Sequence, residues 1–275
     1  MFNPLIRMAK AKVRAYLRER VESALARSEG HFYVYDPRTD RLGRISGFDQ
    51  IGVLLKGHPV NPGYGDCHWV PYLDKIAYDG TIVFDVGGFR GYTAVWFARR
   101  ARQVICFEPS PANQDAIREQ IRIRGVGNVE LVPFAVSDRA GRSTLHLKPR
   151  QGHHSLGDIG ATTTIGSVEV ETITLDQFAA ERGIEELGLL KVDVEGFEPE
   201  VFLGAAGLLR RKAIGAIVFE FSPKFYRQRD LPPDRPLQVL ADFGYRVEAL
   251  TGDPFTWSDQ HHGFDQNDLF AFPQL

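Results

Sequence analysis

Short apolar runs alternate with amphipathic stretches from about residue 80 to the end of the chain. The apolar runs predict strands at 81–86, 103–107, 129–132, 188–194, 214–220, 245–250 and 269–272. Apolar positions at helical spacing between them predict helices at 91–101, 111–124, 175–183, 199–211 and 235–243. Parallel strands need a crossover connection, and a helix supplies it. The pattern therefore predicts a Rossmann-like, doubly wound α/β fold with a mostly parallel sheet covered by helices on both faces.

Residues 139–174 break this alternation, because they are rich in Gly, His and Thr and have no clear helical periodicity. They predict two strands, near 143–147 and 168–173, around a loop. We expect this segment to hang over the binding cleft and to contribute, together with residues 1–66, to the choice of substrate.

Residues 1–66 predict an N-terminal extension that is separate from a domain at 67–275. Segment 1–30 combines seven Lys and Arg with three Glu and has its apolar residues roughly on one helical face, which predicts a basic amphipathic helix. Segment 32–45 predicts a hairpin, and the Gly- and Pro-rich stretch 57–66 predicts a linker. The extension could cap the binding site or mediate a homodimer, and its helix could instead lie on an anionic membrane surface.

Charge and composition narrow the class of protein. The formal net charge of -2 at pH 7 gives no basic excess, so no nucleic-acid partner is expected. Cys67 and Cys106 are too few for a disulfide framework, which favours a reducing cytoplasm. No apolar run approaches the roughly 20 residues that span a bilayer, and the N-terminal basic residues do not precede an apolar block as they do in a signal peptide.

The first two predicted strands end in a pattern that suits a nucleotide-containing cofactor. After the first strand, Gly87 and Gly88 allow a tight turn close to a ligand, and Gly91 allows the next helix to pack on the strand. Asp85 at the strand tip suits the ammonium group of an amino-acid moiety. Glu108 ends the second strand about 20 residues later, where a ribose diol finds its acceptor.

An adenine ring would then lie near residues 133–138, which include Ala135 and Asp138. An NAD-dependent oxidoreductase uses the same geometry and is the main alternative. The turn does not match G-x-G-x-x-G, Asp85 would repel a pyrophosphate, and no Tyr-x-x-x-Lys pair occurs to handle a hydride-transfer proton. These features favour a cofactor with a sulfonium group.

The fourth predicted strand carries three charged residues, Lys191, Asp193 and Glu195, on one side. A strand buried on both faces should not hold them without a reason. Glu195, nearest the tip, could orient an acceptor hydroxyl or take its proton, and Asp193 could hold Lys191 or Glu195 in place. The alternative is an internal ion pair between Lys191 and Asp193.

Other candidates lie near the same cleft. Glu220 ends the next strand, and with Asp193 and Glu195 it could hold magnesium, although spacing alone predicts no metal site. His154 lies in the irregular segment, where it could act as a general base or be an ordinary exposed loop histidine. His261 and His262 are explained by a turn between the last two strands.

Several short motifs, taken in order, resemble the FkbM-type methyltransferases over about residues 80–275. The matching segments are 85–93, 108–109, 129–131, 135–138, 174–176, 191–196 and 218–220. The resemblance implies a class I methyltransferase type of fold, S-adenosylmethionine as the cofactor, and O-methylation, often of sugars or polyketide-type hydroxyl groups. It also implies that Asp85, Gly87, Gly91 and Glu108 line the cofactor. The family pattern Asp-Val-Gly-Ala-Asn-Ile-Gly is altered here, since Phe89 stands at the Asn position and cannot take a polar role.

Taken together, the sequence predicts a cytoplasmic S-adenosylmethionine-dependent O-methyltransferase with a saccharide, glycolipid or polyketide-like acceptor. Peripheral membrane contact through residues 1–30 stays open. Besides the oxidoreductase, a non-catalytic S-adenosylmethionine-binding module is an alternative, because the glycine turn departs from the family pattern at Phe89 and Arg90.

Overall fold

The computed structural model describes the backbone of residues 31–36 and 41–46, and it describes Leu73 and residues 76–149, 153–160, 163–258 and 267–274. The chain divides into two compact units, Met1–Cys67 and His68–Leu275. In the first unit, β1 (His31–Asp36) pairs antiparallel with β2 (Arg41–Ser46). The amphipathic helix predicted for residues 1–30 and the linker predicted for 57–66 lie outside the described residues.

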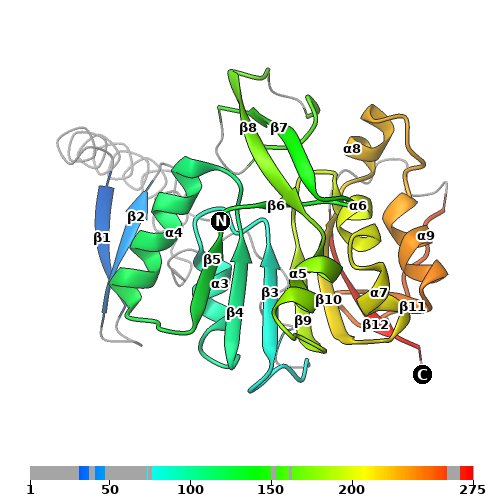
Figure 1. Cartoon of the computed structure of the whole chain (residues 1–275), viewed down its shortest axis with the longest axis horizontal. Coiled ribbons are helices and arrows are strands. Elements are labelled where there is room, and N and C mark those ends of the chain that lie inside the picture. The colour runs from blue at the N-terminus through cyan, green and yellow to red at the C-terminus, as the bar shows by residue number, and fades with distance from the viewer. Residues whose placement is uncertain are drawn as a thin grey trace, which may run out of the picture. The chain divides into compact units, whose positions relative to one another are not determined.

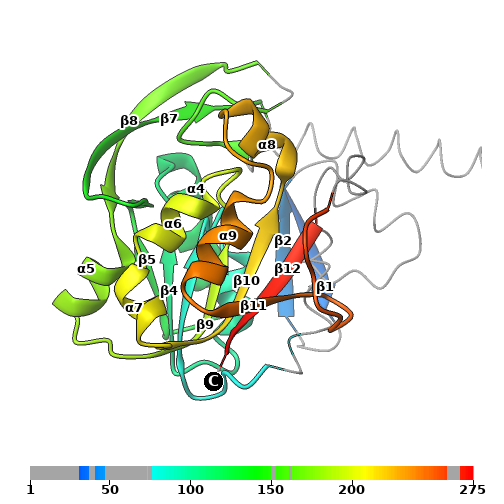
Figure 2. The same cartoon turned by 90° about the vertical axis from the view of Figure 1, so that its right-hand side faces the viewer.

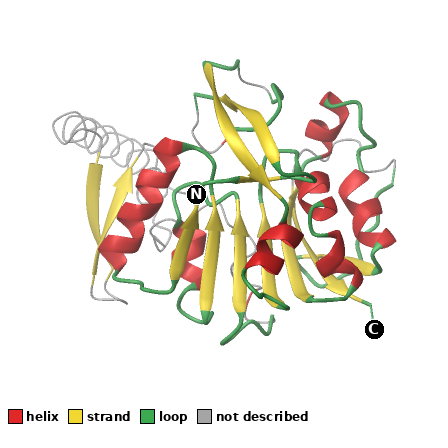
Figure 3. Ribbon diagram, viewed as in Figure 1, coloured by secondary structure: helices red, strands yellow, loops and turns green. Residues whose placement is uncertain are grey.

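The second unit contains a seven-stranded sheet in the order β11-β12-β10-β9-β3-β4-β5 (Figures 1 and 3). Its strands are β3 (Ile82–Val86), β4 (Gln103–Phe107), β5 (Val129–Val132), β9 (Leu187–Val192), β10 (Ile214–Phe221), β11 (Tyr245–Ala249) and β12 (Asn267–Pro273). β12 pairs antiparallel with both of its neighbours, β10 and β11, and the other neighbouring strands of this sheet pair parallel. The predicted Rossmann-like, mostly parallel sheet is confirmed. The chain adds β4 and β5 on one side of β3 and then continues with β9 on the other side. The strand order therefore reverses at β3, and ligands bind at such a point.

Seven helices are described in this unit. They are α3 (Tyr92–Phe97), α4 (Pro111–Arg124), α5 (Leu175–Glu181), α6 (Glu198–Leu203), α7 (Ala206–Arg210), α8 (Pro223–Gln228) and α9 (Arg235–Asp242). Helices α5, α6, α7 and α9 lie on one face of the sheet (Figures 1 and 2). None of the helices in the described part of the chain has the length and apolar composition needed to cross a membrane.

The core forms between that sheet face and these helices. Edge-to-face ring contacts join Phe84 to Phe107 at 5.3 Å between centroids, Phe107 to Phe178 at 4.9 Å, and Phe202 to Phe219 at 5.4 Å. All five rings are almost completely buried. Because helices cover the sheet, its strands are continuous apolar runs. The packed core in turn holds the ends of β3, β4 and β9 in fixed positions.

The helix predicted for 199–211 is in fact two helices. The break falls at Gly204, where a Cβ atom would lie 2.1 Å from the backbone oxygen of Ser137. The carboxylate of Asp176 then accepts hydrogen bonds from the backbone nitrogens of Gly207 (2.6 Å) and Leu208 (2.9 Å). Donors at a helix start need such an acceptor, so Asp176 fixes the beginning of α7.

A second, three-stranded sheet covers the carboxyl ends of the parallel strands (Figure 1). It consists of β6 (Ala135–Val136), β7 (Gly141–Leu147) and β8 (Gly166–Ile173), in the order β6-β8-β7. Strands β7 and β8 pair antiparallel, which confirms the two strands predicted in the irregular segment. The loop between them brings His153 and His154 over the end of the main sheet.

Candidate functional site

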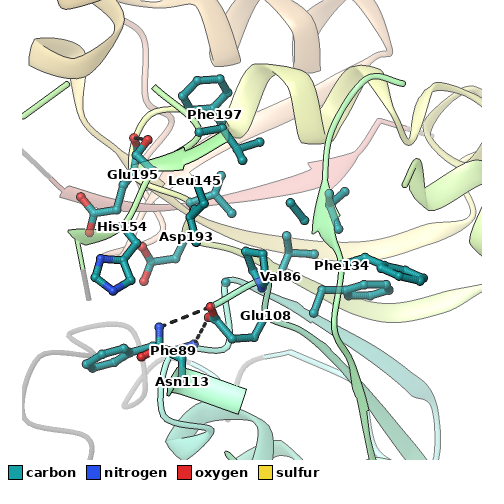
Figure 4. Close-up of a pocket in the computed structure, with 18 residues that line it drawn as sticks. Val86, Phe89, Glu108, Asn113, Phe134, Leu145, His154, Asp193, Glu195 and Phe197 are labelled. Carbon is teal, nitrogen blue, oxygen red and sulfur yellow. Dashed lines mark hydrogen bonds between the residues drawn. The ribbon is translucent and has the colours of Figure 1, made fainter. Parts of the chain in front are cut away.

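One cavity lies at the carboxyl ends of the parallel strands, and the residues that follow β3, β4, β5 and β9 line it together with β6, β7 and the loop at 154–156 (Figure 4). In Figure 4, Phe134 lies on one side of Glu108, whereas Asp193, Glu195 and His154 lie on the other side. We call the part lined by Asp193 and Glu195 the acidic end. Of the ten site residues predicted from the sequence, six line the cavity: Gly87, Glu108, Ala135, His154, Asp193 and Glu195.

The turn after β3 is packed directly against the end of β9. Gly87 has φ +80°, and a Cβ atom there would lie 1.8 Å from the backbone oxygen of Asp193. Only glycine fits this position. Gly88 and Gly91 do not line the cavity; they allow close packing on Cys106 and Ile117. The glycines thus bring two strand ends together at the cavity wall.

Glu108 is held by the turn and by the start of α4. Its carboxylate accepts hydrogen bonds from the backbone nitrogens of Phe89 (2.8 Å) and Ser110 (2.8 Å) and from the side-chain nitrogen of Asn113 (3.3 Å). Burial raises the pKa of Glu108 to about 7, although these hydrogen bonds act to lower it. A carboxylate offers about four acceptor positions, so it retains capacity for a donor from a ligand in the cavity.

Asp85 lies beneath the turn, fully buried, and is not among the residues that line the cavity. The hydroxyl of Thr93 donates to its Oδ2 (2.5 Å), and the ammonium group of Lys191 lies 3.3 Å from its Oδ1. Burial raises the pKa of Asp85, and the nearby Lys191 only partly opposes this effect. The direct contact with a ligand ammonium group stays a prediction, while the observed contacts support the turn.

Lys191 connects Asp85 to the acidic end. Its Nζ donates to the backbone oxygen of Gly87 (2.7 Å) and lies 3.6 Å from Asp193 Oδ2. The ion pair between Lys191 and Asp193, considered from the sequence, is therefore present, but Lys191 lies closer to Asp85.

The segment proposed for adenine contributes apolar walls. Phe134, Ala135 and Val136 line the cavity together with Phe107. Asp138 is exposed, accepts a hydrogen bond from the hydroxyl of Ser137 (3.1 Å), and does not line the cavity. The apolar walls suit a flat aromatic ring, whereas Asp138 lies away from it.

Glu195 has an unusual backbone conformation at the acidic end. Its φ is +54°, which is uncommon for a residue other than glycine. The hydroxyl of Ser155 donates to its backbone oxygen (2.9 Å), and its carboxylate lies 3.6 Å from His153 Nδ1. Burial raises the pKa of Glu195, the neighbouring Asp193 adds to the rise, and His153 opposes it.

Glu220 is buried behind these residues. Asp193, Glu195 and Glu220 can place one carboxylate oxygen each within 4.8 Å of one another. Burial raises the pKa of Glu220 well above its usual value, and repulsion from Asp193 and Glu195 contributes. Clustering of acids does not by itself make a metal site, and we assign no metal to it.

The two histidines of the covering loop differ in their contacts. Nδ1 of His154 accepts a hydrogen bond from the backbone nitrogen of Lys148 (3.1 Å), and burial lowers the pKa of this ring. A neutral ring that accepts at Nδ1 carries its proton on Nε2, and the general-base role of His154 stays a prediction. His153, which no sequence pattern distinguished from His154, is the histidine beside Glu195. His261 and His262 lie outside the described residues.

A family model matches more than half of the chain. Residues 80–247 match the family model described as "Methyltransferase FkbM domain". A 2-O-methyltransferase, NoeI, of Sinorhizobium fredii is 28% identical over 178 residues, which cover 59% of this chain and 72% of that protein. A hexuronic acid methyltransferase, AglP, of Haloferax volcanii is 29% identical over 148 residues, covering 53% of this chain and 59% of that protein.

A 31-O-demethyl-FK506 methyltransferase, FkbM, of Streptomyces tacrolimicus is 31% identical over 156 residues, covering 46% of this chain and 59% of that protein. The chain thus spans less than two thirds of the last two relatives. Among solved structures, a methyltransferase FkbM from Methylobacillus flagellatus aligns with a TM-score of 0.46 and 12% identity over 83% of this chain and 56% of that one.

Proposed function

The chain belongs to the FkbM methyltransferase family, and from this membership we propose that it transfers the methyl group of S-adenosylmethionine to a hydroxyl group of a saccharide, or of a lipid-linked or polyketide-like molecule. Two of the relatives have names that specify transfer to oxygen, and the third is named for a hexuronic acid. The observation that carries the proposal is that one continuous cavity has Glu108 in its middle, apolar rings on one side and the acidic end on the other.

The residues of the cavity fit this cofactor. Glu108 would accept hydrogen bonds from the ribose hydroxyl groups, and Phe134 with its apolar neighbours would contact the adenine ring. The turn at Gly87 would lie beside the methionine part. When bound, S-adenosylmethionine would supply a methyl group on a positively charged sulfur: the acceptor oxygen would bond to the methyl carbon while the carbon–sulfur bond breaks with its electron pair to sulfur, and the hydroxyl proton would be released.

Glu195 is the residue we assign to that proton. It lies at the acidic end with its side chain 12% exposed, so it can contact an acceptor while being largely shielded from water. Because burial and Asp193 raise its pKa, its carboxylate is a stronger base than an exposed glutamate. Asp193, whose side chain is 47% exposed, would hold a second hydroxyl of the acceptor, and His153 would keep the Glu195 carboxylate oriented.

The test is transfer of labelled methyl from S-adenosylmethionine to a panel of glycosides and lipid-linked sugars, with Glu195→Gln as the variant. We expect turnover to fall by about 100-fold or more, while the affinity for S-adenosylhomocysteine changes less than about two-fold. Glu185→Gln is the matched control, because Glu185 is exposed and precedes β9 at the opposite end of the sheet.

Three results would contradict the proposal. Full activity of Glu195→Gln would remove the proton-acceptor role. Binding of the cofactor without methylation of any acceptor would favour a non-catalytic module. Saturable binding of NAD without binding of S-adenosylhomocysteine would favour an oxidoreductase.

A further inference from the structure

Apart from His154, the ionisable side chains that line the cavity are acidic. Among the described residues, the lining includes Glu108, Asp193 and Glu195, and it includes no lysine or arginine. Glu108 lies at the part assigned to the cofactor ribose. The acceptor therefore meets Asp193 and Glu195, two groups that attract hydrogen-bond donors and repel negative charge.

Further carboxyl groups lie behind the acidic end. Glu220 is 5% exposed, and in the strand register of β10 and β12 it lies opposite Asp268. Burial raises the pKa of Asp268 to about 7, and Asp193 contributes to the rise. After burial, the causes of the raised pKa of Glu220 are four carboxylates, those of Asp193, Glu195, Glu198 and Asp268. These groups already oppose one another's ionisation, so a further negative charge brought by an acceptor would meet the same repulsion.

The nearby cations are engaged with groups of the protein. Lys191 lies between Asp85 and Asp193 and donates to the backbone oxygen of Gly87. Arg229 pairs with Glu200 and stacks on the ring of Phe197, with its guanidinium carbon 3.7 Å from the ring centroid. Lys148 pairs with Asp158 at 2.9 Å.

Two more basic groups face Glu195 itself. His153 lies beside its carboxylate, and Lys224 of α8 exerts a weaker electrostatic attraction. Arg90, in the glycine turn, has its guanidinium 5.3 Å from the ring centroid of Phe89. None of these basic residues lines the cavity. Among the described lining residues the basic group is His154, and burial lowers the pKa of its ring, so the lining offers an anionic acceptor no lysine or arginine.

The positive charge of the cofactor does not outweigh the acidic groups around the acidic end. S-adenosylmethionine brings one sulfonium charge to the acidic end, and Lys191 brings another. Five carboxyl groups lie around them, those of Asp85, Asp193, Glu195, Glu220 and Asp268. An acceptor that carries hydroxyl groups supplies donors to these oxygens, whereas an acceptor carboxylate supplies none.

We propose that the acidic end selects an acceptor with no carboxylate or phosphate near the reacting hydroxyl, that is, a neutral, hydroxyl-rich sugar or polyol segment whose hydroxyl groups donate to Asp193 and Glu195. This inference rests on the proposed methyl transfer to a hydroxyl group. It separates the chain from its relative named for a hexuronic acid.

The test uses three acceptors with one ring: a methyl hexopyranoside, the corresponding hexuronate, and the uronamide, which is the neutral counterpart of the hexuronate. At pH 8 we expect kcat/KM for the hexuronate to be at least 10-fold lower than for the uronamide, because like charges at close range are strongly disfavoured. The hexopyranoside and the uronamide should agree within about three-fold. A hexuronate used as well as the uronamide would overturn the inference.

A charge-removing variant tests the cause. Asp268 does not line the cavity, so Asp268→Asn removes a negative charge behind the acidic end without removing a contact to the acceptor. The ratio of kcat/KM for hexuronate over uronamide should rise at least three-fold, and Glu185→Gln should leave it unchanged. An unchanged ratio in Asp268→Asn would show that charge does not cause the selection.

Failure of this inference is distinct from failure of the proposed function. Failure of the function appears as no methyl transfer to the hexopyranoside and the uronamide alike. Equilibrium binding of the hexuronate and the uronamide to the complex with S-adenosylhomocysteine, measured by NMR, does not depend on turnover. Tighter binding of the hexuronate would overturn the inference even then.

Discussion

At the scale of single residues, two residues that line the cavity have a left-handed backbone conformation. L-residues other than asparagine and aspartate rarely adopt it. Phe89 has φ +48° and Glu195 has φ +54°. Such a conformation costs on the order of 1 kcal/mol or more. The backbone nitrogen of Phe89 is fixed by Glu108, and the backbone oxygen of Glu195 is fixed by Ser155. Both strained residues are therefore held by hydrogen bonds within the cavity wall.

The strain at Phe89 gives a first prediction. Asparagine tolerates the left-handed region better than other non-glycine residues, and it is also the residue of the family pattern. Phe89→Ala removes the ring but keeps the strain, so it is the matched control. We expect Phe89→Asn to be more stable than Phe89→Ala by about 1 kcal/mol in urea unfolding. Equal stability of the two variants would show that the backbone at residue 89 is not strained.

Glu108 gives a second prediction. Glu108→Gln keeps the size of the side chain and removes its charge, so we expect binding of S-adenosylhomocysteine to weaken by about 1–3 kcal/mol. Because the pKa of Glu108 is raised to about 7, affinity of the original protein should also rise between pH 6 and pH 8 as the carboxylate ionises. Calorimetry at both pH values measures the two effects. The variant should lose the pH dependence; if its affinity equals that of the original protein, Glu108 does not contact the cofactor.

At the scale of elements, local patterns predicted the strands well and the helix boundaries less well. Each predicted strand of the main sheet overlaps an observed one, because an apolar run of that length has no other way to be buried here. The break between α6 and α7 depends on Gly204 meeting Ser137 and on Asp176 capping α7. Contacts so far apart in the sequence leave no local signal. The helix α8 (Pro223–Gln228) was not predicted, because six residues are too few to show a helical period.

The candidate site shows the same limit. Glu108, Asp193 and Glu195, which were predicted from their positions at strand ends, line the cavity. The hydrophobic pattern of the strand alone could not show that Asp85 points beneath the turn toward Lys191. A buried strand has apolar residues on both faces, so its sequence does not distinguish them. Nor could the sequence pattern decide between the neighbours His153 and His154, which depends on the conformation of the loop that covers the sheet.

The packing of the turn after β3 against the end of β9 gives a third prediction. A Cβ at Gly87 would lie 1.8 Å from the backbone oxygen of Asp193, and φ is +80°. Gly87→Ala should therefore destabilise the protein by about 3 kcal/mol and weaken cofactor binding. Gly127→Ala is the matched control, because a Cβ there would have no atom within 4 Å. Thermal and urea unfolding measure both variants, and equal stability would mean that the two strand ends are not in contact.

At the scale of the whole molecule, acidic groups collect at the carboxyl edge of the sheet. Burial is the largest cause of a raised pKa for six of them: Asp85, Glu108, Glu195, Glu198, Glu220 and Asp268. The opposite edge of the sheet has no comparable cluster among the residues with shifted pKa values in the described part of the chain. The buried carboxyl groups, which destabilise the folded protein when they ionise, thus lie around the cavity. Such a concentration is expected where function and stability compete.

This concentration sets the pH dependence of stability. A carboxyl group whose pKa is raised on folding binds protons more tightly in the folded state than in the unfolded state. The free energy of unfolding then falls as pH rises from the unfolded pKa, near 4 to 4.5, through about 7 for Glu108, Glu198 and Asp268 and further for Glu220. The slope is about 1.4 kcal/mol per pH unit for each proton that differs. The lowered pKa of His154 acts in the opposite direction, but it is one group against several.

We therefore expect the free energy of unfolding in urea to decrease from pH 5 to pH 8. The free energy of unfolding of Glu220→Gln should fall less steeply with pH, by up to about 1.4 kcal/mol per pH unit. The neutral amide keeps the shape of the side chain but cannot ionise. Glu185→Gln, which changes an exposed residue at the other end of the sheet, should leave the slope as it is. A stability that rises over this pH range, or an equal slope in Glu220→Gln, would mean that these carboxyl groups are ionised and well solvated in the folded protein, and the low-dielectric acidic end inferred from their burial would not exist.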